Sequence, residues 1–290
     1  MANLLEKYIG GFTAIALTFG SFIACGTQMY KVSVADDFDN QRATAAHPPS
    51  ADKTSTLYGI HAPHGWQDLP VPFRFSTEMN EGQKIHLMAA MKKWEWAIGR
   101  RIFDFTGEHA GTNGDSFQDL YSSLQDDING YYLDDHWGKT KKSDHVLATT
   151  IWNNGVDYSI IKKSDIRFNN EYYLFGDSLE LRSTPARVVV DMQSLALHEL
   201  GHLLGLAHID ESVDSLSIMN PELLIGEGLT TRMLSRGDLE RIQMIYGCEG
   251  KSCDIEAMIK EQESVDWDKL TLTAKRWMQT PGESPTLELH

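Results

Sequence analysis

The sequence predicts an α+β fold, because segments with the pattern of strands and segments with the pattern of helices both occur along its 290 residues. The strand-like segments are 71–75, 146–152, 158–168 and 186–191. Before the second of these, apolar residues recur at helical spacing at Leu87, Met91, Trp94 and Ile98, with Thr77 as the expected N-cap. Apolar residues also cover most of the stretch 195–204, which predicts a helix buried at the centre of the domain.

This buried helix carries the residues that indicate chemistry. His198 and His202 are four apart, so both imidazoles lie on one face of the helix and can bind the same ion. Gly205 permits a sharp exit from the helix, which lets His208 return toward that ion. Three neutral imidazoles leave one position of a tetrahedral zinc open, as in catalytic rather than structural sites. Glu199 lies beside the first histidine and need not bind the metal.

The pattern HExxHxxGxxH, followed by Met219 and Pro221, resembles the signature of the metzincin metalloproteases. The surroundings, from about 69 to 248, are most similar to the matrixins, although Ile209 follows the third histidine where matrixins have serine. The resemblance implies a zincin-like catalytic domain with a mixed twisted sheet, an active-site helix and a Met-turn at Met219 and Pro221. It also implies one catalytic Zn²⁺ on the three histidines, with Glu199 as the catalytic residue.

The implied function is that of a zinc-dependent endopeptidase, which hydrolyses peptide bonds in proteins through a zinc-bound water activated by Glu199. The substrate would lie along an edge strand, expected within 165–173, and the Met-turn would form the wall of the pocket after the cleaved bond. Two alternatives stay open. One is a lipid-anchored, zinc-binding surface or recognition protein without protease activity, against which the intact Glu199 argues. The other is a zinc amidase acting on cell-wall peptides, against which only the resemblance argues.

Charge limits the class of partner. The formal net charge of −15 argues against a nucleic acid or an anionic membrane surface as the partner, because both would repel the protein. We therefore expect a protein or peptide substrate, no nucleic acid, contact with a membrane only through a lipid anchor, and a monomer.

The N-terminal segment predicts export. Residues 1–24 have an apolar run from 9 to 24 after Lys7, and residues 21–26 resemble a bacterial lipobox in which Cys25 is lipidated after cleavage. An ordinary cleaved signal and an uncleaved anchor are the alternatives. Because Gly26 follows the cysteine, we expect an exported lipoprotein at the outer membrane or cell surface.

The remaining chain divides into three regions. Residues 25–65 lack a sustained period and predict a flexible tether, whose His61 and His64 are read as ordinary linker histidines rather than as inhibitory metal ligands. Residues 66–250 are the catalytic domain, and 251–290 are a helical extension and tail. Cys248 and Cys253 can close a small disulfide loop in an oxidising compartment, the alternative being two free thiols.

Calcium is a second cofactor to consider. Carboxylates are frequent between 104 and 144, and matrixins bind calcium and a second zinc in the corresponding region. The segment 125–136 does not satisfy the EF-hand pattern, and the zinc-binding histidines of that region are not evident. Calcium therefore stays open, and we assign no ligands to it.

Overall fold

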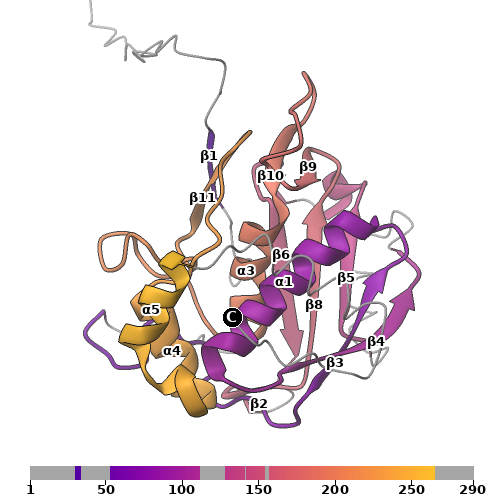
Figure 1. Cartoon of the computed structure of the whole chain (residues 1–290). Coiled ribbons are helices and arrows are strands. Elements are labelled where there is room, and N and C mark those ends of the chain that lie inside the picture. Colours follow the sequence, from indigo (N-terminus) through magenta and orange to yellow (C-terminus); the bar gives the residue numbers. More distant parts are fainter. Residues whose placement is uncertain (1–29, 34–52, 112–127, 141, 154–156, 265–290) are drawn as a thin grey trace, which may run out of the picture.

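A mixed five-stranded sheet forms the centre of the domain (Figure 1). The computed structural model describes residues 30–33, 53–111, 128–140, 142–153 and 157–264. The strands of the sheet, in spatial order, are β4 (Phe103–His109), β3 (Val71–Ser76), β5 (Gly130–Asp134), β8 (Lys163–Asn169) and β6 (Ala148–Asn153). The first four strands run parallel to one another, whereas β6 is antiparallel to β8 and forms an outer edge. The expected mixed sheet is therefore confirmed.

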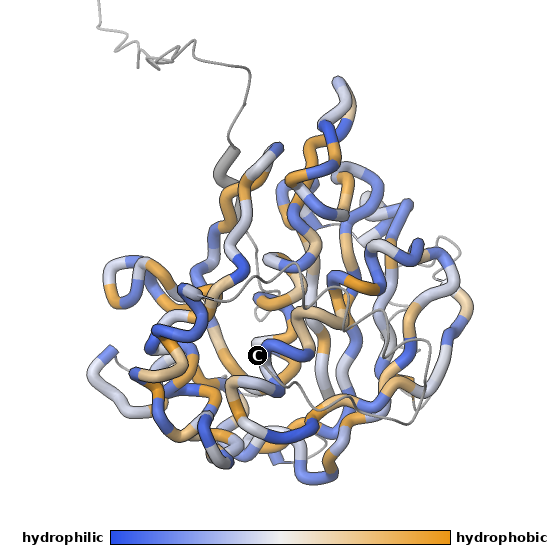
Figure 2. The backbone as a smooth tube through the Cα atoms, in the orientation of Figure 1, coloured by the Kyte–Doolittle hydropathy of each residue, from blue (hydrophilic) through white to orange (hydrophobic). Residues whose placement is uncertain are grey.

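Two helices pack together beside this sheet, and both are largely buried (Figure 1). They are α1 (Glu81–Ile98) and α3 (Met192–Leu203), and the indole N–H of Trp94 on α1 donates to the Leu197 carbonyl of α3 at 3.0 Å. Hydrophobic stretches recur in α3 and in the strands of the sheet, as Figure 2 shows. Side chains such as Leu200 and Leu203 are fully buried, which confirms the expectation of a central active-site helix.

The helix α1 begins three residues later than expected. Its N-cap is Asn80, whose side chain accepts from the Gln83 amide while the Gln83 side chain accepts from the Asn80 amide. Thr77 was the expected cap, and this expectation is wrong because Thr77 still extends the sheet. Its amide donates to the His109 carbonyl of β4 at 2.9 Å.

Two strands of the sheet were not predicted, and both have polar residues at buried positions. Every residue of β5 is buried, so the strand lacks the alternation that marks a half-exposed strand. Its Asp134 is fully buried because it accepts from the equally buried Arg167 of β8 at 2.6 Å. β4 was missed as well, and the segment 158–168 is divided into β7 (Ile160–Ile161) and β8.

Part of the predicted tether belongs to the folded domain. Residues 53–66, here named the N-terminal strap, lie against the end of α3, where the amides of His61 and Ala62 donate to the Gly205 carbonyl. The strap ends in β2 (Gly65–Trp66), which pairs with β7. Farther upstream, β1 (Tyr30–Ser33) pairs antiparallel with β11 (Glu222–Ile225). A composition typical of a flexible tether therefore did not prevent the N-terminal strap from packing on the domain.

The remaining elements surround the site. β9 (Tyr173–Gly176) pairs with β10 (Val188–Asp191), which leads directly into α3, and η1 (Trp137–Thr140) follows β5. The closing helix α4 (Arg236–Tyr246) begins after its N-cap Ser235. It is followed by η2 (Gly250–Cys253) and α5 (Ile255–Ser264), and α5 contacts α4. Cys248 and Cys253 form a disulfide.

Several predictions fall on residues that the structure does not describe. The signal segment 1–24, Cys25 and the tail from 265 onward all lie outside the described residues. Of the predicted C-terminal extension, α5 is present. Within the described ranges, no helix combines the length and apolar character needed to cross a membrane.

Candidate metal centre and active site

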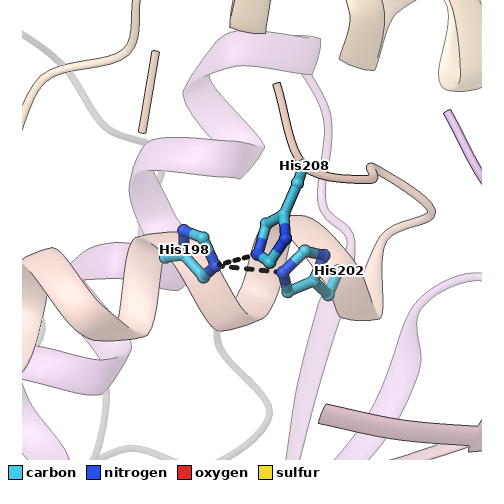
Figure 3. A group of neighbouring side chains, drawn as sticks. All are labelled: His198, His202 and His208. Carbon is cyan, nitrogen blue, oxygen red and sulfur yellow. Dashed lines mark hydrogen bonds between the residues drawn. The ribbon is translucent and has the colours of Figure 1, made fainter. Parts of the chain in front are cut away.

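Three histidine side chains from α3 and the turn behind it converge on one point (Figure 3). His198 and His202 project from successive turns of the helix, and Gly205 then adopts a φ of +108°, which a residue with a Cβ rarely adopts. The chain reverses there and brings His208 to the two helical histidines. One ligand atom from each residue lies within 4.8 Å of the others.

The hydrogen bonds of the rings show which nitrogens are available to a metal. Nδ1 of His198 donates to the Ile218 carbonyl at 2.7 Å, and Nδ1 of His202 donates to the Leu206 carbonyl at 2.8 Å. With the proton on Nδ1, each Nε2 presents a lone pair. Backbone carbonyls thus hold both rings with Nε2 facing the centre, as metal-binding histidines require.

The spacing of these Nε2 atoms fits a zinc ion. Nε2 of His198 lies 3.0 Å from that of His202 and 3.2 Å from that of His208. Tetrahedral zinc with bonds of about 2.0–2.1 Å places its nitrogen ligands about 3.3 Å apart. Two lone pairs facing each other at 3.0 Å would repel, and a cation between them removes this repulsion. The three residues therefore fit zinc in donor type, tautomer and distance.

Burial keeps the three imidazoles neutral. It lowers the pKa of His198 to about 4 and that of His208 to about 3, and it holds the pKa of His202 well below its ordinary value. Only neutral imidazole binds a metal, so the rings need to lose no proton at neutral pH before they bind zinc.

The Met-turn packs directly under the helix, as the resemblance implied. Met219 is fully buried, and its sulfur lies so close to α3 that a Cβ placed on Gly201 would be 2.3 Å from it. Gly201 therefore provides the space for Met219. Sequence reasoning did not assign this role, although a glycine inside a helix is a signal of close packing. Pro221 follows the turn and precedes β11.

A buried aspartate of α4 holds the Met-turn in place. Asp238 is fully buried and accepts from the Ser217 hydroxyl and, at 2.9 Å, from the Ile218 amide. The carbonyl of the same Ile218 accepts from His198, so Asp238 positions a candidate zinc ligand through a single residue. Sequence reasoning missed Asp238. Its position three residues after Ser235, the N-cap of α4, matches a capping box and could have indicated it.

Glu199 is almost fully buried, and its two carboxylate oxygens differ. Oε2 accepts from the Thr150 hydroxyl at 2.6 Å, whereas Oε1 has no hydrogen-bond partner among the described residues. Burial raises the pKa of Glu199 to about 7, against the lowering effects of the Thr150 hydrogen bond and of the Lys142 charge. A carboxylate with such a pKa can both take and release a proton near neutral pH.

The edge strand beside the site is β6, which corrects the expectation of an edge within 165–173. Residues 163–169 form β8, which lies between β5 and β6 and has no free edge. β6 contacts α3, and among the described residues it pairs with β8 alone. Antiparallel pairing with β8 made β6 the edge, and the order of strands in the sequence does not reveal that pairing.

The strap histidines do not join the three-histidine group. Nε2 of His61 bonds the His202 carbonyl at 2.8 Å, and its ring stacks on Trp152 of β6 with centroids 4.1 Å apart. His64 bonds the Ser159 hydroxyl at 2.9 Å. His61 therefore supports the backbone of a ligand, a role that its place in an apparent tether did not suggest.

Comparisons with known proteins agree with this geometry. A family model described as Matrixin matches residues 75–247. The chain is 37% identical to Metalloendoproteinase 5-MMP of Arabidopsis thaliana over 79 residues, which cover 27% of this chain and 21% of the plant protein. It is 34% identical to Metalloendoproteinase 2-MMP of the same plant over 125 residues, which cover 43% of this chain and 30% of that protein. The matched regions thus cover less than a third of each plant protein.

Proposed function

Because the chain belongs to the matrixin family, we propose that it is a zinc-dependent endopeptidase that hydrolyses peptide bonds in proteins. The observation that carries this proposal is the arrangement of α3. Three Nε2 atoms are spaced for zinc, and the adjacent Glu199 presents a buried carboxylate oxygen without a partner. Both plant relatives are named metalloendoproteinases, which supports the same reaction class.

Bound zinc would act as a Lewis acid that acidifies a water molecule and polarises the peptide carbonyl. Glu199 supplies the base. Its Oε1 takes one proton from the water as the water oxygen bonds to the carbonyl carbon, and it returns that proton to the amine nitrogen as the C–N bond breaks. Burial, which raises the pKa of Glu199, strengthens this carboxylate as a proton acceptor.

The substrate would bind as an extended strand along the outer edge of β6. Within the described part of the chain, β6 pairs with β8 alone, and a strand paired on one side can add a peptide strand on the other. Residues beyond the Met-turn, including the buried Leu223 of β11, would form the wall of the pocket that follows the cleaved bond.

Cleavage of a mixed peptide library by the purified, zinc-loaded protein tests the proposal. Glu199→Ala should retain one zinc per chain and lose at least about 100-fold in kcat, because the proton acceptor is gone. His202→Ala should lose the metal. Full activity of Glu199→Ala would refute the mechanism. Zinc binding without cleavage of any peptide would favour a recognition protein, and cleavage of cell-wall peptides alone would favour an amidase.

We also propose that the protein is exported and lipidated at Cys25. The lipobox-like sequence supports this location, and so does the disulfide between Cys248 and Cys253, since disulfides persist in oxidising compartments. Labelling of the expressed protein with a radioactive fatty acid tests it. The label should be absent from Cys25→Ser, and a label that persists in this variant would exclude the assignment.

A further inference from the structure

We propose that Thr150 is a positioning residue for Glu199: its hydroxyl holds one carboxylate oxygen so that the other one faces the reaction. This inference rests on the proposed hydrolytic function and adds a residue to it. Thr150 belongs to β6, a strand that contributes none of the three histidines. Its hydroxyl reaches Glu199 across the contact between β6 and α3.

The contact is short, buried and made by two regular elements. The Thr150 hydroxyl donates to Oε2 of Glu199 at 2.6 Å, and it lies 3.1 Å from the Glu199 carbonyl oxygen. Thr150 is 6% exposed and Glu199 is 1% exposed, so water has little access to compete for these atoms. β6 is fixed by antiparallel pairing with β8, where Thr150 lies opposite Ile166. Residues on strands and helices are positioned more rigidly than residues on loops.

The two oxygens of Glu199 would otherwise be equivalent. The terminal torsion of a glutamate is broad and roughly two-fold, so an unsupported carboxylate can exchange its oxygens and tilt its plane. Hydrogen bonds to an ionised group are about twice as strong as neutral ones, and of the two carboxylate oxygens only Oε2 is bonded by Thr150. Oε1 is thereby left as the oxygen that accepts the proton, and it has no competing partner among the described residues.

Steady-state kinetics of zinc-loaded Thr150→Val and Thr150→Ser test this role. Valine preserves the shape of the side chain and removes the hydroxyl, so we expect kcat to fall by about 10- to 100-fold, the range for a lost hydrogen bond to a charged group. KM and zinc content should stay at the wild-type values. Serine restores the hydroxyl and should recover most of kcat.

A matched control separates this effect from the general loss of a buried hydroxyl. Ser252 is 5% exposed, and its hydroxyl lies 3.0 Å from the Ile98 carbonyl and 2.8 Å from the Glu249 carbonyl at η2, outside the site. Ser252→Ala should lose stability but keep kcat within about twofold. The proposal is overturned if Thr150→Val keeps wild-type kcat, or if Thr150→Ser is as slow as the valine variant. If Thr150→Val fails to hold zinc, the serine variant is compared with the wild type, and a loss of about 10-fold or more in its kcat overturns the proposal.

Infrared difference spectra provide a readout that does not depend on cleavage. Subtracting the spectrum of Glu199→Gln from that of the wild type isolates the carboxylate band of Glu199. That band should shift in the Thr150→Val background and remain in place in the Ser252→Ala background. An unshifted band would refute the proposal. Absence of peptide cleavage by the wild type would refute the proposed function instead, and the spectra would still test the contact.

Discussion

The individual side chains of the site are held by partners that are distant in the sequence. His198 donates to the carbonyl of Ile218, and Glu199 accepts from Thr150. Each bond fixes one atom and leaves the opposite atom of the same side chain free for zinc or for a proton. The chemistry therefore depends on single hydrogen bonds, and the loss of each can be measured by substitution of its partner.

Gly201 offers a test of packing at this scale. Alanine inside a helix is favoured over glycine by about 1 kcal/mol, but its Cβ would lie 2.3 Å from the sulfur of the buried Met219. Overpacking of a core costs about 1–3 kcal/mol, so we expect Gly201→Ala to lower the melting temperature and to weaken zinc binding. Gly138→Ala is the control, because the nearest atom to its Cβ lies 3.9 Å away. A more stable Gly201→Ala would contradict this packing.

His61 predicts how stability depends on pH. Burial lowers its pKa from 6.5 to about 4, so the unfolded chain takes up this proton before the folded one does. Stability contributed by neutral His61 is therefore complete above about pH 6.5 and is lost as the pH falls toward 4. At pH 5 the loss is about 2 kcal/mol.

Urea unfolding at pH 7.5 and pH 5 in excess zinc measures this loss. His61→Phe keeps an aromatic ring against Trp152 and removes the titration, so its stability should fall less on acidification. His145→Phe replaces an exposed histidine and should behave as the wild type does. Equal pH dependence of His61→Phe and wild type would contradict the assignment to His61.

The site depends on contacts between α3 and several other elements. α3 provides ligands, and α4 provides the buried Asp238 that fixes the Met-turn beneath them. β6 provides Thr150 and the open edge, while the N-terminal strap bonds the turn at Gly205 and the carbonyl of His202. Removing a contact between two elements should therefore affect zinc as well as stability.

Asp238→Ala tests this coupling. The change leaves the amides of Ile218 and Ser235 and the hydroxyl of Ser217 without their acceptor, which should cost about 3 kcal/mol. Zinc affinity, measured by competition with a chromogenic chelator, should fall with it. Asp254→Ala removes a cap from the start of α5, far in sequence from the Met-turn, and should cost about 1 kcal/mol without changing zinc affinity. Unaltered zinc binding by Asp238→Ala would show that the Met-turn does not depend on α4.

Across the whole molecule, the metal site joins parts of the chain that a single helix could not hold together. Ligands come from α3 and the following turn, and their support comes from the edge of the sheet, the Met-turn, α4 and the strap. The imidazoles of His198 and His202 are buried, and the three imidazoles are crowded together. Binding of zinc to the folded state alone should therefore stabilise the entire domain.

Chelation should therefore lower the melting temperature, and added zinc should restore it. At a zinc concentration 100 times the Kd, the stabilisation is about 2.7 kcal/mol. His202→Ala should melt at one temperature with or without the chelator, because it cannot hold the metal. A wild-type melting temperature that is insensitive to chelator would show that the three histidines do not hold zinc in the folded protein.

Local pattern determined the parts of the fold that depend on near neighbours. The four-residue spacing of His198 and His202 predicts a shared face, Gly205 predicts the chain reversal, and the apolar residues of 195–204 predict burial. The strands predicted at 71–75 and 186–191 are found at 71–76 and 188–191. Together these features determined the α+β class and the three-histidine site.

Tertiary structure decided everything that depends on which segments become neighbours. Only the sheet order makes β6, rather than β8, the edge beside α3, and this order brings Thr150 to Glu199. Only packing explains why Gly201 faces Met219, why Asp238 reaches Ile218, and why a strap of tether-like composition docks on the helix end. These contacts join residues far apart in the chain, and their energies depend on burial and geometry that local residue patterns do not encode.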